Sequence, residues 1–233
     1  MNVLVVDIGG SHVKLHATGQ PTARRFDSGK HLTPVGLVEE VKKITAGWPH
    51  DVVSLGYPGA VGPSGPEAEP GNLGPGWLGF DFAAAFGRPV RVVNDAAMQA
   101  LGAYTGGRML FLGLGTGLGS ALVTDRVVVP LELGSLPYGR RESMADRVGK
   151  RGLVRHGEAA WQATVAEVVE RLRHALKSDY VVLGGGNAKR VRPLPRHTRR
   201  GGNEDAITGG LRLWEEEVDP HRCPTAAAWR VVR

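Results

Sequence analysis

The sequence predicts an α/β protein, in which strands and helices alternate along the chain. Short runs rich in valine, leucine and isoleucine recur between turn residues, as expected for buried strands. Segments with apolar residues at helical spacing separate several of these runs. Hydrophobic residues make up 42% of the 233-residue chain, which is enough for a packed core rather than a disordered chain.

The N-terminal segment predicts a meander of three short strands. Residues 2–7 form an apolar run that ends in Asp7, and tight turns separate it from strands expected near 13–17 and 22–27. The first run has no basic segment before it and no small-residue cleavage site after it. We therefore interpret it as a strand and not as a signal peptide.

A helix and a strand follow the meander. Pro34 suits the first turn of a helix, and one face of that helix carries the apolar residues Leu37, Val41, Ile44 and Trp48. A strand is expected at 52–57. Residues 58–79 form a long loop rich in glycine and proline, and loops of this length in a compact domain are usually functional.

The remaining elements complete the alternation. A buried strand expected at 89–93 leads through Asn94 and Asp95 into an alanine-rich helix at 96–104. Further strands are expected within 109–124 and at 126–130 and 180–183, and further helices near 142–150, 158–177 and 204–216. We expect a first lobe of residues 1–104 and a second lobe of residues 105–233, with the final helix as a candidate to pack back on the first lobe.

Charge and cysteine content limit the class of protein. The formal net charge is +6, and basic residues gather at 140–155 and 189–200, where they form a solvated surface or attract a polyanion. Few aromatic residues lie among them, which argues against nucleic acid as a partner. No apolar run is long enough to span a membrane. The single cysteine, Cys223, excludes an intrachain disulfide and a cysteine-based zinc cluster, so we expect a reducing, cytoplasmic location.

Three glycine-rich turns at strand ends suggest phosphate binding. They lie at 7–14, at 112–120 and at 184–187, and the third is expected to begin a helix. Glycine allows backbone N–H groups to approach an anion closely. Each turn also has a purely structural explanation, as a tight hairpin or a strand-to-helix turn, so none is decisive alone. The second turn is not a P-loop, because it lacks the Gly-Lys-Ser/Thr ending.

Asp95 stands where a strand meets a helix. One explanation of the Asn94-Asp95 pair is a helix N-cap, a position that both residue types favour. The other is a catalytic carboxylate, whose charged form the helix dipole would favour. A carboxylate of low pKa suits phosphoryl transfer, because the loose transition state mainly requires that the attacking hydroxyl be oriented.

Taken together, these features resemble the superfamily of sugar kinases, Hsp70 and actin, and within it the ROK family of sugar kinases. DIGGSHVK at 7–14 is similar to the first phosphate motif of that family, and GYPGAVG at 56–62 to its GxPG segment. VVNDAAMQALGAY at 92–104 is similar to its substrate motif, whose aspartate is the catalytic base. LGLGTGLGSALV at 112–123 is similar to its second phosphate motif.

The resemblance continues to the third glycine turn. LELGS at 131–135 is similar to the ELGH sugar-binding motif of the ROK family, and LGGGNAK at 183–189 to its adenosine-region motif. The short chain and the GNLGPGW segment at 71–77 most resemble the polyphosphate-dependent glucokinase branch. The resemblance implies an actin-like fold with two lobes around a central cleft. It also implies a kinase that phosphorylates the 6-hydroxyl of a hexose such as glucose.

The same resemblance implies the roles of individual residues. Asp95 would be the catalytic base, and Asp7 would face Mg²⁺ through water. ATP or polyphosphate would be the donor, zinc would be absent, and a homodimer is expected. Sugar hydroxyls would contact Asn72, Asn94, Asp95, Glu132 and Glu142. Phosphates would contact Gly9, Gly10, Ser11, Lys14, Gly115, Thr116 and Gly117, and the nucleotide Gly184, Gly185, Gly186 and Asn187.

Two departures from the family pattern leave alternatives open. Ser135 replaces the histidine of ELGH, and the cysteine zinc motif of many ROK proteins is missing. A second hypothesis is therefore a sugar- or nucleotide-binding protein with weak or no kinase activity. A third is a polyanion-binding module, which would leave the glycine motifs unexplained.

Overall fold

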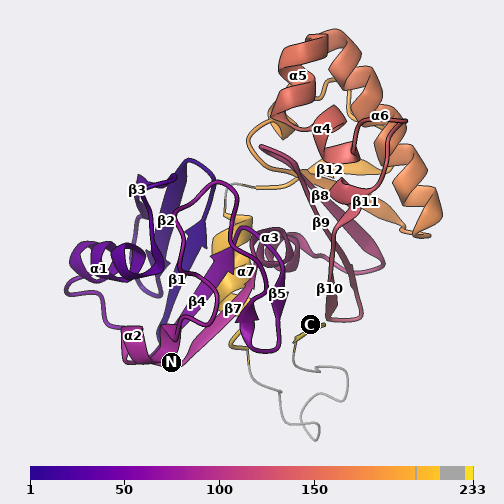
Figure 1. Cartoon of the computed structure of the whole chain (residues 1–233). Coiled ribbons are helices and arrows are strands. Elements are labelled where there is room, and N and C mark those ends of the chain that lie inside the picture. The colour runs from indigo at the N-terminus through magenta and orange to yellow at the C-terminus, as the bar shows by residue number, and fades with distance from the viewer. Residues whose placement is uncertain (203, 216–228, 233) are drawn as a thin grey trace, which may run out of the picture.

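Two β-sheets, each covered by helices, form two lobes in the computed structural model of the chain (Figure 1). The structure describes residues 1–202, 204–215 and 229–232. Cys223 and the end of the helix expected at 204–216 lie outside these described residues. The order of the first sheet is β3-β2-β1-β4-β7 and that of the second is β12-β11-β8-β9-β10-β13, so the predicted mixed α/β class is confirmed.

The first sheet contains the predicted meander. Its strands are β1 (Val3–Ile8), β2 (His12–Ala17), β3 (Arg24–Asp27), β4 (Val52–Tyr57) and β7 (Val90–Asn94). β1 pairs antiparallel with β2 and parallel with β4, which pairs parallel with β7. Both faces of β1 and β4 are buried, which explains their continuous apolar sequence.

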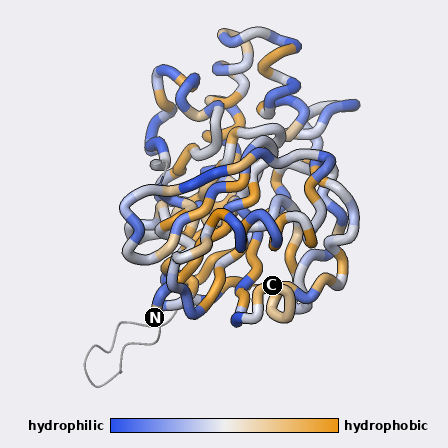
Figure 2. The backbone as a smooth tube through the Cα atoms, turned by 90° about the vertical axis from the view of Figure 1, so that its left-hand side faces the viewer, coloured by the Kyte–Doolittle hydropathy of each residue, from blue (hydrophilic) through white to orange (hydrophobic). Residues whose placement is uncertain are grey.

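Alternate residues of β1 face two different helix layers. Leu4 and Val6 pack with α1 (Pro34–Ile44) and α2 (Phe82–Phe86), whereas Val3 and Val5 pack with α3 (Asp95–Ala103) and α7 (Asp205–Arg212). The helix α1 begins where predicted, since the Thr33 hydroxyl accepts the Gly36 N–H and proline occupies the first turn. Figure 2 shows hydrophobic residues concentrated along the strands in the interior.

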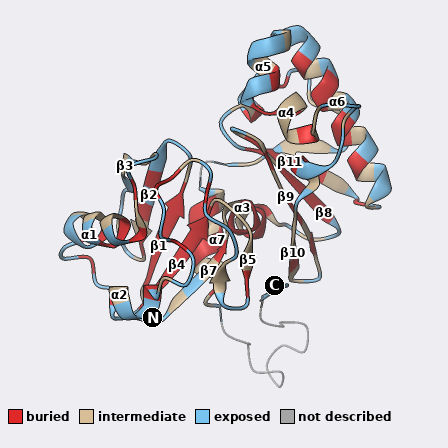
Figure 3. Cartoon of the chain, viewed as in Figure 1, coloured by how far each residue is buried: buried red, intermediate tan, exposed pale blue. Residues whose placement is uncertain are grey.

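The second sheet carries helices on its outer face. Its strands are β8 (Met109–Leu114), β9 (Leu118–Thr124), β10 (Val127–Leu131), β11 (Tyr180–Gly184), β12 (Thr198–Arg200) and β13 (Arg230–Val231). The covering helices are α4 (Met144–Val148), α5 (Lys150–His156) and α6 (Glu158–Ala175). Buried residues of α6, among them Trp161 and Val165, pack on β8 and β11 (Figure 3).

The helices α3 and α7 lie against each other between the two sheets (Figure 1). Small residues allow this contact: a methyl group on Gly102 would lie 1.8 Å from the Asp205 carbonyl oxygen. The helix α7 also packs on β1, and the Ser54 hydroxyl of β4 donates to the Gly210 carbonyl at 2.6 Å. The final helix therefore lies on the sheet formed by the first part of the chain.

Some elements differ from the sequence prediction. The expected loop at 58–79 contains the short strands β5 (Val61–Gly62) and β6 (Gly65–Pro66). The expected helix at 142–150 is α4 alone, with α5 beginning after Gly149. The strands β12 and β13 were not predicted, because three or fewer residues provide no readable alternation. Among the described residues, no helix is both long and apolar enough to cross a membrane.

Candidate active site

A cleft of about 960 Å³ lies between the two sheets. The three predicted glycine turns line it, together with the first residues of α3, part of the loop after β4 and the segment after β10. Because parallel strands β1, β4 and β7 end at the same edge of their sheet, residues far apart in sequence meet there. Most of the residues predicted to act on a ligand line this one cleft.

Asn94 is the N-cap of α3. Its side-chain oxygen accepts the Ala97 N–H at 3.0 Å, and its Nδ2 donates to the Gly59 carbonyl at 3.0 Å. The amide of Asn94 therefore keeps one N–H for a ligand. The capping explanation applies to Asn94 and leaves Asp95 available for the cleft.

Asp95 is the first residue of α3, and its carboxylate lines the cleft. Its Oδ1 accepts the Ala96 N–H at 2.8 Å. The pKa of Asp95 is raised to about 7, with burial as the largest cause; the carboxylates of Asp7 and Glu132 also raise it, whereas the hydrogen bond from the Ala96 N–H lowers it. The expected low pKa is therefore wrong, because burial and like charges outweigh the helix N-terminus.

Asp7 lies at the end of β1 and is buried. Burial raises its pKa, and Lys14, its partner residue on β2, lowers it. Carboxylate oxygens fit Mg²⁺, which proteins commonly hold through one or two carboxylates together with substrate phosphates. Within the described residues, no group of three or more His, Cys, Asp or Glu side chains could hold a metal ion. Phosphate oxygens would thus have to complete a magnesium site at Asp7.

The first glycine turn is braced by the end of β3. The Ser28 hydroxyl donates to the Gly9 carbonyl at 2.7 Å, and the Ser28 N–H donates to the Ser11 carbonyl at 3.0 Å. Gly9, Gly10 and Lys14 line the cleft. Ser11 is exposed and lies outside the cleft lining, so the structure does not bring its hydroxyl to the other residues predicted to bind phosphate.

The second glycine turn is held from two sides. The Lys150 N–H donates to the carbonyls of Gly115 and Thr116, and the Asn187 Nδ2 donates to Gly115 at 3.2 Å. Gly115, Thr116 and Gly117 line the cleft as predicted. Asn187, expected to contact a nucleotide, lies outside the lining and braces this turn instead.

The third glycine turn does not begin a long helix. Gly184, Gly185 and Gly186 line the cleft, but only the single turn η2 (Ala188–Arg190) follows them. The expectation of a helix N-terminus here is wrong. Arg200 of β12 holds the segment instead, because its guanidinium donates to the Val191 carbonyl at 2.6 Å.

The sugar end of the predicted site is incomplete. Asn72, Glu132 and Ser135 line the cleft, and the Ser135 hydroxyl donates to the Glu132 carbonyl at 2.7 Å. Glu142 lies outside the lining, since its carboxylate pairs with Arg155 and, at 3.6 Å, with Arg147. Its predicted contact with a sugar stays a prediction.

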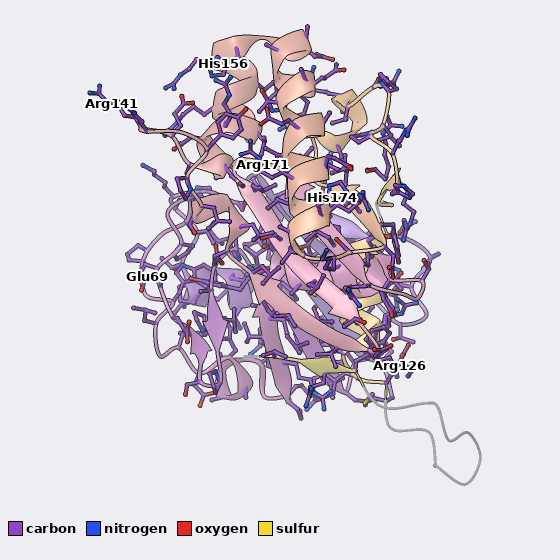
Figure 4. The ribbon with its side chains drawn as sticks, turned by 90° about the vertical axis from the view of Figure 1, so that its right-hand side faces the viewer. Glu69, Arg126, Arg141, His156, Arg171 and His174 are labelled. Atoms are coloured by element: carbon purple, nitrogen blue, oxygen red, sulfur yellow. The ribbon has the colours of Figure 1, made fainter. Side chains whose placement is uncertain are left out.

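Other lining residues had no clear signal in the sequence. His12, Gln99, Lys189 and Arg200 all line the cleft. The clusters of basic residues at 140–155 and 189–200 were visible, but which of their members face the cleft depends on tertiary structure. Arg141, for example, points away from the body of the protein (Figure 4).

A second cavity of about 670 Å³ adjoins the second glycine turn. It shares Thr116 and Gly117 with the cleft and is otherwise lined by α4 and α5 residues, including Lys150, Arg151 and Arg155. Arg151 pairs with Asp146 at 2.7 Å. Basic side chains thus lie beside the turn that is predicted to hold phosphate.

Comparisons with known sequences and with solved structures found similar proteins. No protein-family model matches the chain. The polyphosphate glucokinase of Mycobacterium tuberculosis is 25% identical over 210 residues, which cover 80% of this chain and 78% of that protein. The inorganic polyphosphate/ATP-glucomannokinase of an Arthrobacter species superimposes with a TM-score of 0.77 at 24% identity, covering 90% of this chain and 96% of the other.

A ROK family glucokinase shares the same fold. The enzyme from Streptomyces griseus, solved in complex with glucose and AMPPNP, superimposes with a TM-score of 0.69 at 15% identity. The superposition covers 90% of this chain and 98% of that enzyme. These likenesses confirm the predicted actin-like fold.

Proposed function

We propose that this chain is a sugar kinase of the ROK family and that it phosphorylates the 6-hydroxyl of a hexose, with glucose as the first candidate. The observation that carries the proposal is the environment of Asp95. Its carboxylate lines a cleft shared with both phosphate turns, and its pKa is raised to about 7. A general base works best when its pKa lies near the operating pH.

In the proposed reaction, Asp95 orients the sugar hydroxyl and accepts its proton. The carboxylate accepts a hydrogen bond from the sugar hydroxyl and orients its oxygen toward the terminal phosphorus of the donor. As the new O–P bond forms, the bond from that phosphorus to the bridging oxygen of the donor breaks, and the hydroxyl proton passes to Asp95. The loose transition state requires mainly this positioning.

Backbone N–H groups of the first and second glycine turns would hold the phosphates. Lys14 supplies a positive charge in the same cleft. Asp7 would hold Mg²⁺ through water, and a magnesium ion in that place would neutralise charge on the phosphate oxygens. Asn72, Asn94 and Glu132 offer amide and carboxylate groups to the sugar hydroxyls.

The donor that we favour is polyphosphate, with ATP as the alternative. The similarity to the polyphosphate glucokinase of Mycobacterium tuberculosis supports this choice. So does the cavity beside Thr116, because its basic residues Lys150, Arg151 and Arg155 outnumber its carboxylate, Asp146, and would attract a chain of phosphates longer than that of ATP.

A matrix of initial rates tests the proposal. Glucose, mannose and several other sugars are each offered with ATP and with polyphosphate, in the wild type and in Asp95→Asn. Turnover of at least one hexose that is lost in Asp95→Asn supports the proposal. If sugars bind but none is turned over with either donor, the chain is a binding protein. Ser135 in place of the family histidine is the observation that keeps this second candidate open.

A further inference from the structure

An exposed carboxylate, that of Glu69, holds the loop that follows it. Its oxygens accept hydrogen bonds from three consecutive backbone N–H groups, those of Gly76 at 3.2 Å, Trp77 at 3.1 Å and Leu78 at 3.3 Å. Bonds from N–H groups to a charged carboxylate are roughly twice as strong as bonds between neutral groups. Figure 4 shows Glu69 at the edge of the molecule.

The backbone at Gly76 makes this arrangement possible. Its φ of +98° lies in the left-handed region, which glycine adopts without strain. The turn at Gly76 directs its own N–H and the next two toward the same carboxylate. A side chain at position 76 would oppose the conformation that Glu69 stabilises.

The same loop is anchored in the core of the first lobe. Trp77 is fully buried, its ring centroid lies 5.6 Å from that of Tyr57, and its Nε1 donates to the Gly74 carbonyl at 2.6 Å. Leu73 is also buried, and the Gly74 N–H donates to the Leu32 carbonyl at 2.9 Å. Contacts of Leu73 and Gly74 at one end and of Trp77 at the other thus fix residues 73–77. Asn72 lies immediately before this segment.

Asn72 lies at the place where the two phosphate turns approach each other. A methyl group on Gly10 would lie 3.1 Å from Asn72 Nδ2 and 3.5 Å from Thr116 Oγ1. The amide therefore stands beside the first turn, with the Thr116 hydroxyl of the second turn close by. Under the proposed function, a group held there would reach both an acceptor hydroxyl and the phosphoryl group that is transferred to it.

We propose that Glu69 is a positioning residue for phosphoryl transfer, which acts by fixing the loop that places the Asn72 amide between the two phosphate turns. The inference rests on the proposed kinase function, and it adds a residue that touches neither sugar nor phosphate. Small errors in the position of a reacting group can cost up to about a hundredfold in rate. Loosening the loop should therefore affect turnover more than the stability of the fold.

A double-mutant cycle tests this coupling. Glu69→Ala should lower kcat/KM for the hexose by about tenfold, mainly through kcat. Glu69→Gln keeps a carbonyl oxygen as acceptor and should restore most of the activity. In an Asn72→Ala background, Glu69→Ala should lower kcat/KM by less than about twofold, because coupled residues are not additive. Glu67→Gln, two positions away, is the matched control and should keep wild-type kinetics.

Equal effects of Glu69→Ala in the wild type and in Asn72→Ala would overturn the proposal, since Glu69 would then act by another route. Wild-type turnover tests the proposed function, whereas hydrogen exchange tests the Glu69 contact without any turnover. Glu69→Ala should speed amide exchange throughout residues 72–78. Faster exchange confined to 76–78 would show that Glu69 does not hold the segment beginning at Asn72, and would also overturn the proposal.

Discussion

Gly209 of α7 packs directly on Met98 of α3, so closely that a methyl group on Gly209 would lie 1.8 Å from the Met98 carbonyl oxygen. The contact joins the final helix to the helix that begins with Asp95. A distance of 1.8 Å leaves no room for a carbon atom beside a backbone oxygen. The place of Asp95 in the cleft thus depends in part on a residue that is remote from it in sequence.

Gly209→Ala should therefore destabilise the protein. Alanine favours a helix over glycine by about 1 kcal/mol, but the clash with the Met98 carbonyl should outweigh this gain and lower the free energy of unfolding by about 3 kcal/mol. Chemical denaturation measures the change. Gly36→Ala in α1 is the control, because a methyl group there would lie 3.5 Å from the nearest atom, an ordinary contact. A stabilised Gly209→Ala variant would show that the two helices are not so tightly packed.

Asp95 should set the pH dependence of activity. With a pKa of about 7, its carboxylate is mostly protonated at pH 6 and mostly ionised at pH 8. Since only the ionised form accepts the hydroxyl proton, kcat/KM should rise about tenfold per pH unit below pH 7 and level off above it. Initial rates from pH 5.5 to pH 8.5 with saturating donor measure the profile. A flat profile over this range would exclude Asp95 as the ionising base.

Ionisation of Asp95 should also lower the free energy of unfolding. An ordinary aspartate has a pKa of 3.8, whereas Asp95 in the folded protein has a pKa of about 7. The folded state therefore binds the proton more tightly than the unfolded state does. The contribution of protonated Asp95 to the free energy of unfolding is therefore complete below pH 3.8 and is lost progressively as the pH rises to about 7. The loss amounts to at most about 4 kcal/mol.

Asp95→Asn should be more stable than the wild type at pH 8 and nearly equal to it at pH 4, because asparagine carries no charge to bury. Thermal melts of both proteins at the two pH values measure the difference. A variant that loses activity and also loses stability at pH 8 would indicate a structural role for the carboxylate. That result would contradict the burial of an unfavourable charge.

The order of the elements and the glycine turns could be predicted from sequence, because each depends on local pattern. The strand at β1, the proline start of α1 and the hairpin at 112–120 are examples. The pKa of Asp95 could not, because its largest cause is burial in the folded protein, and the nearby carboxylates come from β1 and from the segment after β10. The local argument from the helix dipole predicts a lowered pKa for Asp95, whereas its pKa is raised.

Tertiary contacts also place some of the predicted site residues outside the cleft lining. Glu142 matches a sugar-binding position in sequence, yet Arg147 and Arg155 hold its carboxylate outside the cleft. Asn187 follows three glycines, yet it braces the second turn rather than lining the cleft. The role of Glu69 had no sequence signal at all, because its three partners are backbone N–H groups.

Basic residues beside the second glycine turn should select for a long phosphate donor. Lys150→Ala removes a charge from the cavity that adjoins Thr116 and leaves its backbone N–H bonds to the turn unchanged. Because an exposed ion pair contributes up to about 1 kcal/mol, the KM for long-chain polyphosphate should rise about two- to fivefold. The KM for ATP should stay constant if its three phosphates are held by the glycine turns alone.

Salt should reduce the difference, because exposed charges are screened. At high ionic strength the wild type should therefore approach the KM of Lys150→Ala for long chains. Lys42→Ala, which removes an exposed lysine from α1 in the other lobe, is the control and should leave both donors unaffected. An equal rise in KM for ATP and for polyphosphate would place Lys150 at a phosphate common to both donors. It would contradict a route for the distal phosphates along α5.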